Sequence, residues 1–176
     1  MARVTLIDEH ATPDIAALVA KIRGARGGQL HVFYRALLHT PGLASAWFDF
    51  NNAVRFQTGL DDRVRELVIM RVAALTGCAY VWSVHQAQYA GPAGVTPSEV
   101  EALRDWRKAD VFGARECALL AYVDAMTRNV AVNDAVFDEL RKHFDERATV
   151  ELTVLIAAYN MHTRVLSAFD IGPGQA

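Results

Sequence analysis

Helix start and stop signals recur along this 176-residue chain, and convincing strand alternation of polar and apolar residues is absent. The clearest start is Thr96-Pro97-Ser98-Glu99, a capping box with proline at the first helical position, which predicts a helix over residues 97–104. Thr12 and Pro13 begin a helix predicted over residues 13–23 in the same way. We therefore expect an all-α fold, a single-domain bundle of about seven or eight helices over residues 1–176.

The remaining helices follow from similar signals. They are predicted over residues 30–38, 41–57, 62–75, 78–90, 114–128, 134–143 and 145–169. Two stretches within them look alike, the nine residues from Glu66 and the nine residues from Glu151. Amphipathic helices that bury similar faces explain this weak echo, and duplication of a helical unit is left as an alternative.

Charge and cysteine content narrow the classes of partner. A net charge of −2 and a pI near 6.3 give no positive field that would gather phosphates, so nucleic acid is not an expected partner. The most apolar tract, residues 152–163, carries no charge and is too short to span a bilayer. Asp8 and Glu9 come too early for a secretory signal, and two cysteines suit a reducing compartment. These features predict a cytoplasmic protein without a membrane partner.

Residues able to do chemistry gather between Glu66 and His85. A helix-forming segment follows Glu66, Gly77 ends it, and a second helix is expected to begin at Cys78. Residues 61–90 therefore form the predicted core motif, a central helix-turn-helix that carries the site. Four residues of its second helix have i, i+3, i+4 and i+7 spacing and share a face: Cys78, Val81, Trp82 and His85.

This spacing resembles that of the carboxymuconolactone decarboxylase family, whose alkylhydroperoxidase D-like members carry Glu-x11-Cys-x2-Cys-x3-His. The chain has Glu66-x11-Cys78-x2-Val81-x3-His85, so Val81 replaces the second cysteine. The resemblance implies an alkylhydroperoxidase D-like helical fold, a small-molecule substrate, no cofactor, and a homo-oligomer, either a trimer or a hexamer. Because valine has no sulfur, the Cys-x2-Cys disulfide of those relatives cannot form here.

Three residues are the candidate catalytic groups: His85, Glu66 and Cys78. His85 would exchange protons with a ligand, and Glu66 would orient the imidazole and raise its pKa if the two helices fold back on each other. Cys78 would have a lowered thiol pKa at the start of its helix. Ordinary structural roles are the alternative for all three. That alternative is favoured for the other histidines, which are His10, His31, His39, His143 and His162.

Pocket walls are the next expectation. Tyr80 and Trp82 are candidates, together with Val81 on the motif face, and Tyr159 would contribute a phenol to the same cavity. Core filling is the common alternative for aromatic residues on helices. No metal site is expected, since neither Cys-x2-Cys nor His-Glu-x2-His spacing occurs.

Three functions are compatible with these residues. The favoured one is cofactor-free acid-base chemistry, decarboxylation or proton transfer, on a small organic acid or lactone, with His85 as proton donor and Glu66 as its orienting group. The second is a peroxiredoxin-like, thiol-dependent alkyl hydroperoxide reductase that uses Cys78 and requires Cys117 or an external thiol to resolve the oxidised sulfur. The third is a non-catalytic helical binding or assembly module. Because Val81 replaces the second cysteine, the redox hypothesis has less support than the acid-base hypothesis.

Overall fold

Helices carry nearly all of the ordered secondary structure. The computed structural model describes residues 2–174, and that range contains nine α-helices, one 3-10 turn and no strand. The helices are α1 (Pro13–Gly24), α2 (Val32–Leu37), α3 (Pro41–Phe56), α4 (Asp62–Thr76), α5 (Ala79–Gln88), α6 (Pro97–Ala102), α7 (Ala114–Asn129), α8 (Asp134–Arg141) and α9 (Glu146–Ala168), with η1 (Trp106–Lys108) after α6. The all-α prediction is confirmed. Each of the nine helices overlaps one of the ranges predicted above, so the helices number one or two more than the seven or eight expected for the bundle.

Five helices begin at side-chain caps, two of which, Thr12 and Thr96, were identified above from the sequence. The capping residues are Thr12, Asp61, Thr96, Asn133 and Asp145, and each accepts a hydrogen bond from the backbone N–H three residues later. Such a cap satisfies one of the N–H groups left free at a helix start and contributes about 1 kcal/mol. The local sequence therefore sets these helix boundaries before any tertiary contact forms.

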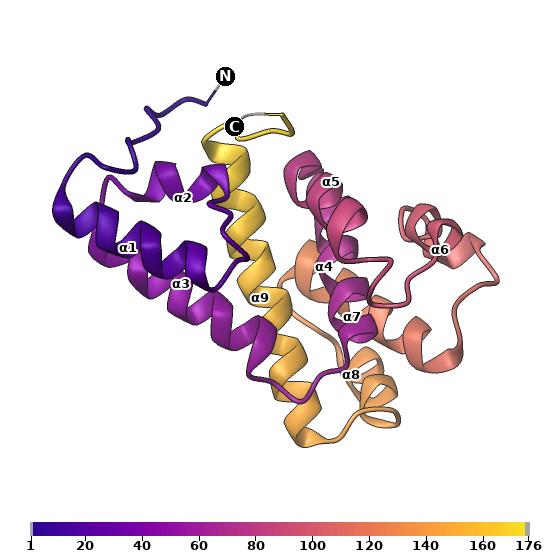
Figure 1. Ribbon diagram of the computed structural model, residues 1–176. Coiled ribbons are helices and arrows are strands. Elements are labelled where there is room, and N and C mark those ends of the chain that lie inside the picture. Colours follow the sequence, from indigo (N-terminus) through magenta and orange to yellow (C-terminus); the bar gives the residue numbers. More distant parts are fainter. Residues whose placement is uncertain (1, 175–176) are drawn as a thin grey trace.

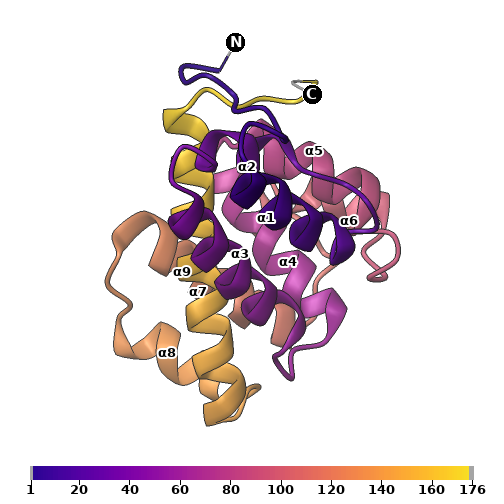
Figure 2. The ribbon, with the colours of Figure 1, turned by 60° about the vertical axis from the view of Figure 1, so that its left-hand side comes forward.

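The α4 helix lies at the centre of the arrangement. It packs against α5, α7 and α9, while α3 packs on α9, and α1 and α2 lie against α3 (Figure 1). The second view shows α1, α2 and α3 together on one side of α9, with α8 beside the lower part of α9 (Figure 2). Residues 67–70 of α4 are completely buried in one apolar cluster that takes side chains from α1 through α9. The two echoed segments are parts of α4 and α9, which pack on each other.

The turn between α4 and α5 is set by a single glycine. Gly77 has a φ of 65° and a ψ of 22°, the left-handed conformation that favours glycine at a helix end. The Cys78 N–H donates to the Ala73 carbonyl at 3.0 Å, so the chain reverses within one residue of the helix end. As a result α5 folds back along α4, and His85 reaches the level of Glu66.

A buried ionic network ties the segment after α6 to the core. The Asp124 carboxylate on α7 accepts a hydrogen bond from Arg71 Nε of α4 at 2.6 Å and also contacts Arg107 and the Trp106 indole. Burial alone would raise the pKa of Asp124, but the hydrogen bonds from the two arginines lower it overall. Arg71 also donates to the Leu103 carbonyl at 2.6 Å. This network fixes α6 and η1 against α4 and α7.

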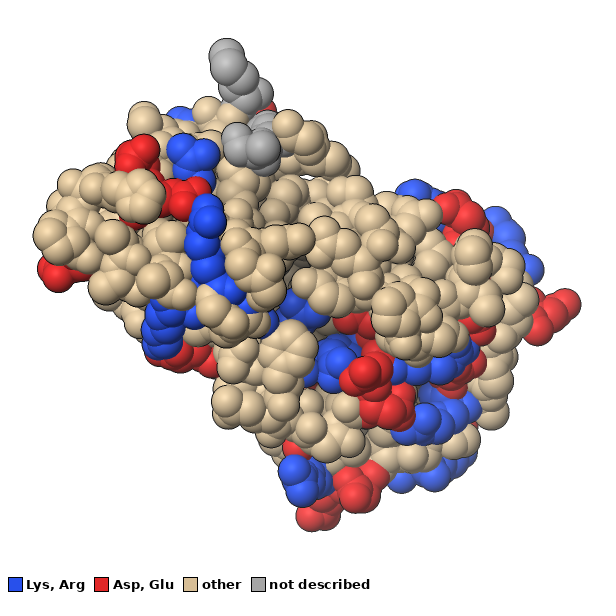
Figure 3. Space-filling view, viewed as in Figure 1, with Lys and Arg blue, Asp and Glu red and all other residues tan. Residues whose placement is uncertain are grey.

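The surface mixes charges of both signs. On the face drawn in Figure 3, acidic and basic side chains alternate over most of the charged regions, and uncharged surface separates them. Within residues 2–174, no helix is both long enough and apolar enough to cross a membrane.

Removing the Asp124 carboxylate should destabilise the fold strongly. The Asp124→Ala substitution leaves Arg71, whose side chain is only 3% exposed, as a buried cation without its carboxylate. We expect the free energy of unfolding to fall by about 3 to 5 kcal/mol in urea titrations. Asp105→Ala, which removes the partner of an exposed lysine, is the matched control and should change stability little. Equal effects of the two substitutions would contradict the proposed importance of this network.

Candidate functional site

A buried carboxylate and a buried imidazole meet between α4 and α5. Glu66 is 2% exposed and His85 is 5% exposed, and Glu66 Oε2 lies 2.6 Å from His85 Nδ1. A neutral imidazole donates its Nδ1–H to a carboxylate, which leaves the lone pair on Nε2. His85 Nε2 has no hydrogen-bond partner among the described residues, and the ring lines a cavity. The arrangement therefore offers an oriented base to whatever enters that cavity.

Burial decides the protonation state of His85. Desolvation lowers the pKa of His85, the contact with Glu66 opposes this effect, and the nearby Arg55 adds to the lowering. The sequence led us to expect an upward shift from Glu66 alone, and burial outweighs that contribution. At neutral pH the imidazole is thus neutral, and protonation of Nε2 produces an imidazolium that Glu66 stabilises.

The cavity beside His85 takes side chains from α2, α3, α5 and α9 and from the loop after α1. Its volume is only about 40 Å³. The cavity is therefore narrow, and a ligand must be slim or flat. Its lining is His85 with Arg26, His31, Phe33, Tyr34, Asn51, Arg55, Tyr80, Val81, Val84, Tyr89, Tyr159 and His162.

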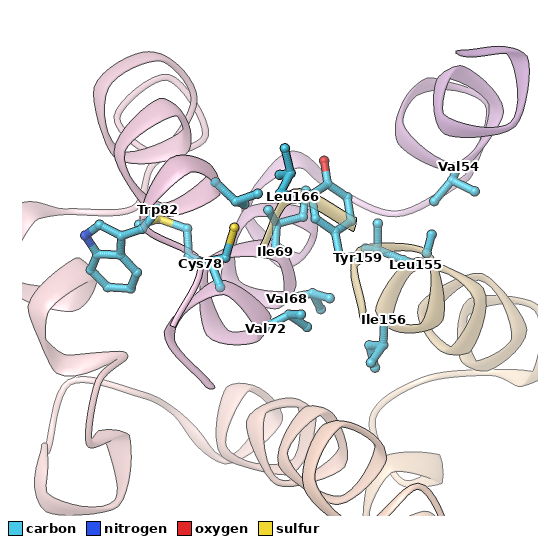
Figure 4. Close-up of a cluster of buried hydrophobic side chains, with 14 of the residues drawn as sticks. Val54, Val68, Ile69, Val72, Cys78, Trp82, Leu155, Ile156, Tyr159 and Leu166 are labelled. Atoms are coloured by element: carbon cyan, nitrogen blue, oxygen red, sulfur yellow. The ribbon is translucent and has the colours of Figure 1, made fainter. Parts of the chain in front are cut away.

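Three of the predicted wall residues lie in this cavity. Tyr80 and Val81 reach it from α5, and Tyr159 reaches it from α9. Burial raises the pKa of Tyr159 to about 12, so its hydroxyl stays protonated and can donate a hydrogen bond. In Figure 4 this hydroxyl points away from the surrounding apolar side chains. The Tyr80 hydroxyl lies 3.4 Å from His31 Nδ1.

Cys78 and Trp82 lie outside the cavity that holds His85. They line a separate surface depression of about 300 Å³ together with Arg104, whose guanidinium stacks on the Trp82 ring at 4.1 Å. Figure 4 shows the Trp82 indole directed away from the side on which Tyr159 lies. Adjacent helical residues differ by about 100°, so Val81 faces the cavity while Trp82 turns to the other depression. The expected common face is divided between two surfaces.

The Cys78 thiol is not activated by its position. The residue is 4% exposed. Backbone N–H groups at the start of α5 lower the pKa of the thiol, but burial raises this pKa by more. Seven residues of helix separate it from His85, a rise of about 10 Å, too far for direct proton transfer. Cys78 and Cys117 are both free thiols and form no disulfide with each other.

Sequence reasoning missed several polar residues of the cavity, among them Arg55 and His162. Arg55 on α3 is 7% exposed, and its nearest carboxylate oxygen is Glu66 Oε1 at 4.0 Å. His162 on α9 is 8% exposed, packs edge-on against Phe33 at 4.6 Å, and has an Nδ1 without a hydrogen-bond partner. Burial lowers the pKa of His162 to about 3. Neither residue has a sequence spacing that would mark it.

Metal ligands do not gather in the cavity. Across residues 2–174, no group of three or more histidine, cysteine, aspartate or glutamate side chains is arranged to hold a metal ion. The polar groups that line the cavity are imidazoles, guanidinium groups, phenols and one amide.

Comparison with known proteins gives a family and a fold. The sequence profile of the carboxymuconolactone decarboxylase family matches residues 41–125. The uncharacterized protein YnjA of Escherichia coli (strain K12) is 34% identical over 118 residues, which are 66% of this chain and 64% of YnjA. This chain therefore spans less than two thirds of the length of that relative.

Solved structures extend the similarity to most of the chain. A protein of unknown function from Agrobacterium tumefaciens is 28% identical, with a TM-score of 0.73 over 78% of this chain and 94% of that one. A peroxidase-related protein from Ralstonia eutropha JMP134 with an alkylhydroperoxidase AhpD core is 23% identical, with a TM-score of 0.82 over 99% and 93%. At this identity the second likeness concerns the fold alone. The alkylhydroperoxidase D-like fold expected from the sequence is confirmed.

Acid should destabilise the protein partly through His162. In the unfolded chain a histidine binds a proton below its ordinary pKa of 6.5, whereas folded His162 stays neutral down to about pH 3, so stability falls as the pH drops below 6.5. Between pH 7.5 and pH 4.5 this one residue should remove about 2 to 3 kcal/mol from the free energy of unfolding.

Urea titrations across this pH range test the expectation. The His162→Gln variant should lose less stability on acidification than the wild type by that amount, whatever its stability at pH 7.5. The exposed His10 supplies the control, because His10→Gln should keep the full pH dependence. An unchanged pH slope in the His162 variant would contradict the assignment.

Proposed function

Since this chain belongs to the carboxymuconolactone decarboxylase family through residues 41–125, we propose that it catalyses cofactor-free proton transfer, including decarboxylation, on a small organic acid or lactone. The observation that carries this proposal is the 2.6 Å contact between buried Glu66 and His85 beside a narrow cavity. A neutral imidazole held by a carboxylate is suited to accept and return a proton at neutral pH.

The proposed reactions need no reagent other than the substrate and solvent. In proton transfer, His85 Nε2 removes a proton from a carbon next to a carbonyl, and the electron pair moves to the carbonyl oxygen as an enolate. The imidazolium then returns the proton to the carbon. In decarboxylation, His85 Nε2 takes up a proton from solvent, the bond to the carboxylate carbon breaks to give CO2 and an enolate, and the imidazolium passes its proton to the enolate carbon and becomes neutral again. The protonated Tyr159 hydroxyl lines the same cavity and would stabilise the enolate oxygen.

Glu66 serves as a positioning residue in this scheme. Its Oε2 fixes the ring orientation through Nδ1, and its negative charge favours the imidazolium that forms during the reaction. Its other oxygen, Oε1, lies 4.0 Å from Arg55, so the same carboxylate also holds the cation near the cavity.

Thiol-dependent peroxide reduction has weaker support. The Cys78 thiol is buried, its pKa is raised, and it lines a different depression from His85. Val81 occupies the position of the missing cysteine, and it lies in the cavity beside His85. Cys117, the other cysteine of the chain, is a free thiol that is not bonded to Cys78.

From the likeness to the family we also propose that the chain assembles as a homo-oligomer, either a trimer or a hexamer.

Replacing His85 should abolish proton transfer. We expect the His85→Ala variant to lose 10²- to 10⁴-fold in the rate of deuterium incorporation from D2O into a small carbonyl acid or carboxylated lactone, on the order of a general acid-base contribution. Glu66→Gln should lose less, because the imidazole remains in place. Proton NMR of a substrate panel measures the exchange.

The exposed histidine again gives a matched control. His10→Ala should retain the wild-type exchange rate. Substrate exchange that proceeds equally in wild type and His85→Ala would remove the acid-base proposal, and absence of exchange or CO2 release with every member of the panel would favour the non-catalytic module.

Peroxide turnover should not depend on Cys78. In a hydroperoxide-consumption assay with dithiothreitol, we expect the wild type, Cys78→Ser and Cys117→Ser to share the background rate, because the buried thiol carries little thiolate. A rate in the wild type that exceeds background and disappears only in Cys78→Ser would establish the redox alternative instead.

A further inference from the structure

Arg55 is a buried cation with few hydrogen-bond acceptors. Its side chain is 9% exposed, its Nε has no hydrogen-bond partner, and the nearest carboxylate oxygen, Glu66 Oε1, is 4.0 Å from its Nη2. Its other neighbours are aromatic: the guanidinium carbon is 4.5 Å from the Tyr89 ring centre and 4.8 Å from that of Phe56. The Tyr89 hydroxyl is a further polar neighbour. A buried guanidinium is costly unless acceptors meet its donors, so these contacts leave donors for an additional acceptor.

His162 lines the same cavity and carries a second polar atom without a hydrogen-bond partner. The residue comes from α9, whereas Arg55 comes from α3, and both line the space beside His85. Its buried Nδ1 has no partner. A neutral imidazole carries one donor and one acceptor nitrogen, so it can bond to an oxygen or to a hydroxyl of a ligand. Two unpartnered polar groups from different helices in one cavity indicate that a ligand completes their hydrogen bonds.

The charges of the lining select an anion. Two cationic side chains, Arg26 and Arg55, belong to it, and no carboxylate does, since Glu66 lies behind His85. The histidines of the lining have lowered pKa values and add no positive charge at neutral pH. Near the cavity there are therefore two positive guanidinium groups and one negative carboxylate, that of Glu66. Binding of a second carboxylate brings the net charge of these groups to zero.

We infer that Arg55 and His162 form a recognition subsite for the carboxylate of a slim, planar, conjugated acid, separate from the His85–Glu66 pair. The guanidinium presents parallel N–H donors that match the two oxygens of a carboxylate. The narrow cavity and its aromatic walls favour a flat carbon chain behind that carboxylate. Neutral lactones and esters would leave the buried guanidinium without an anion. The inference rests on the proposed function only for what happens to the bound acid. Binding of the acid at Arg55 and His162 does not require catalysis.

Direct binding of a matched pair of probes tests the subsite. The trans-but-2-enoate anion is slim, planar and conjugated, and trans-but-2-enamide has the same shape without the charge. By calorimetry or ligand-observed NMR at pH 7.5, we expect the acid to bind the wild type at least about 10-fold more tightly than the amide, as for a hydrogen bond to a charged group.

The variants separate this inference from the catalytic proposal. Arg55→Met should lower affinity for the acid about 10-fold or more and leave amide binding unchanged, Arg55→Lys should recover part of the loss, and His162→Gln should weaken acid binding. Arg104→Met is the matched control, since Arg104 also stacks on an aromatic ring but lines the Cys78 depression. His85→Ala should still bind the acid even though it has lost proton transfer.

Circular dichroism establishes that each variant is folded, and the Arg55→Lys variant keeps the charge should Arg55→Met not fold. Equal binding of acid and amide to the wild type would overturn the inference, as would an unchanged preference in Arg55→Met, and either result leaves the deuterium-exchange test of His85 standing. Acid binding by a wild type that exchanges no deuterium would overturn the catalytic proposal and keep the subsite.

Discussion

The hydrogen bond between His85 Nδ1 and Glu66 Oε2 depends on how α4 and α5 are joined. Gly77 reverses the chain in a left-handed conformation, and α5 then returns along a helix whose central residues are completely buried. The pair is therefore held by the most tightly packed part of the molecule, and its geometry does not depend on flexible segments. Arg55 takes its position from the same carboxylate, through Oε1, so the contents of the cavity are organised around Glu66.

Burial outweighs local electrostatics at both sequence-predicted reactive groups. For His85 a neighbouring carboxylate favours the charged ring, yet desolvation lowers its pKa overall. For Cys78 the start of α5 favours the thiolate, yet desolvation raises its pKa. The consequences differ, because a neutral imidazole with a free nitrogen is a usable base, whereas a protonated thiol is a poor nucleophile. The same physical effect thus supports one candidate chemistry and opposes the other.

The sequence predicts helices more completely than it predicts the cavity. Caps such as Asp61 and Thr96 act within one helical turn, so their positions can be read from neighbouring residues. The meeting of Glu66 and His85 also follows from short-range order, since one turn separates their helices. Arg55 and His162 could not be found in this way, because α3 and α9 approach each other only in the folded molecule. Helical spacing places Trp82 on the same face as His85, but spacing alone does not tell which of two adjoining surfaces the side chain meets.

Proton transfer and ligand recognition are assigned to different pairs of helices. The Glu66–His85 pair lies on α4 and α5, while Arg55 and His162 come from α3 and α9. Substitutions on the second pair can alter which molecule is accepted while the reactive group remains in place. Such a division of labour makes this scaffold evolvable, and directed mutagenesis restricted to the inward faces of α3 and α9 is the natural route to new specificities.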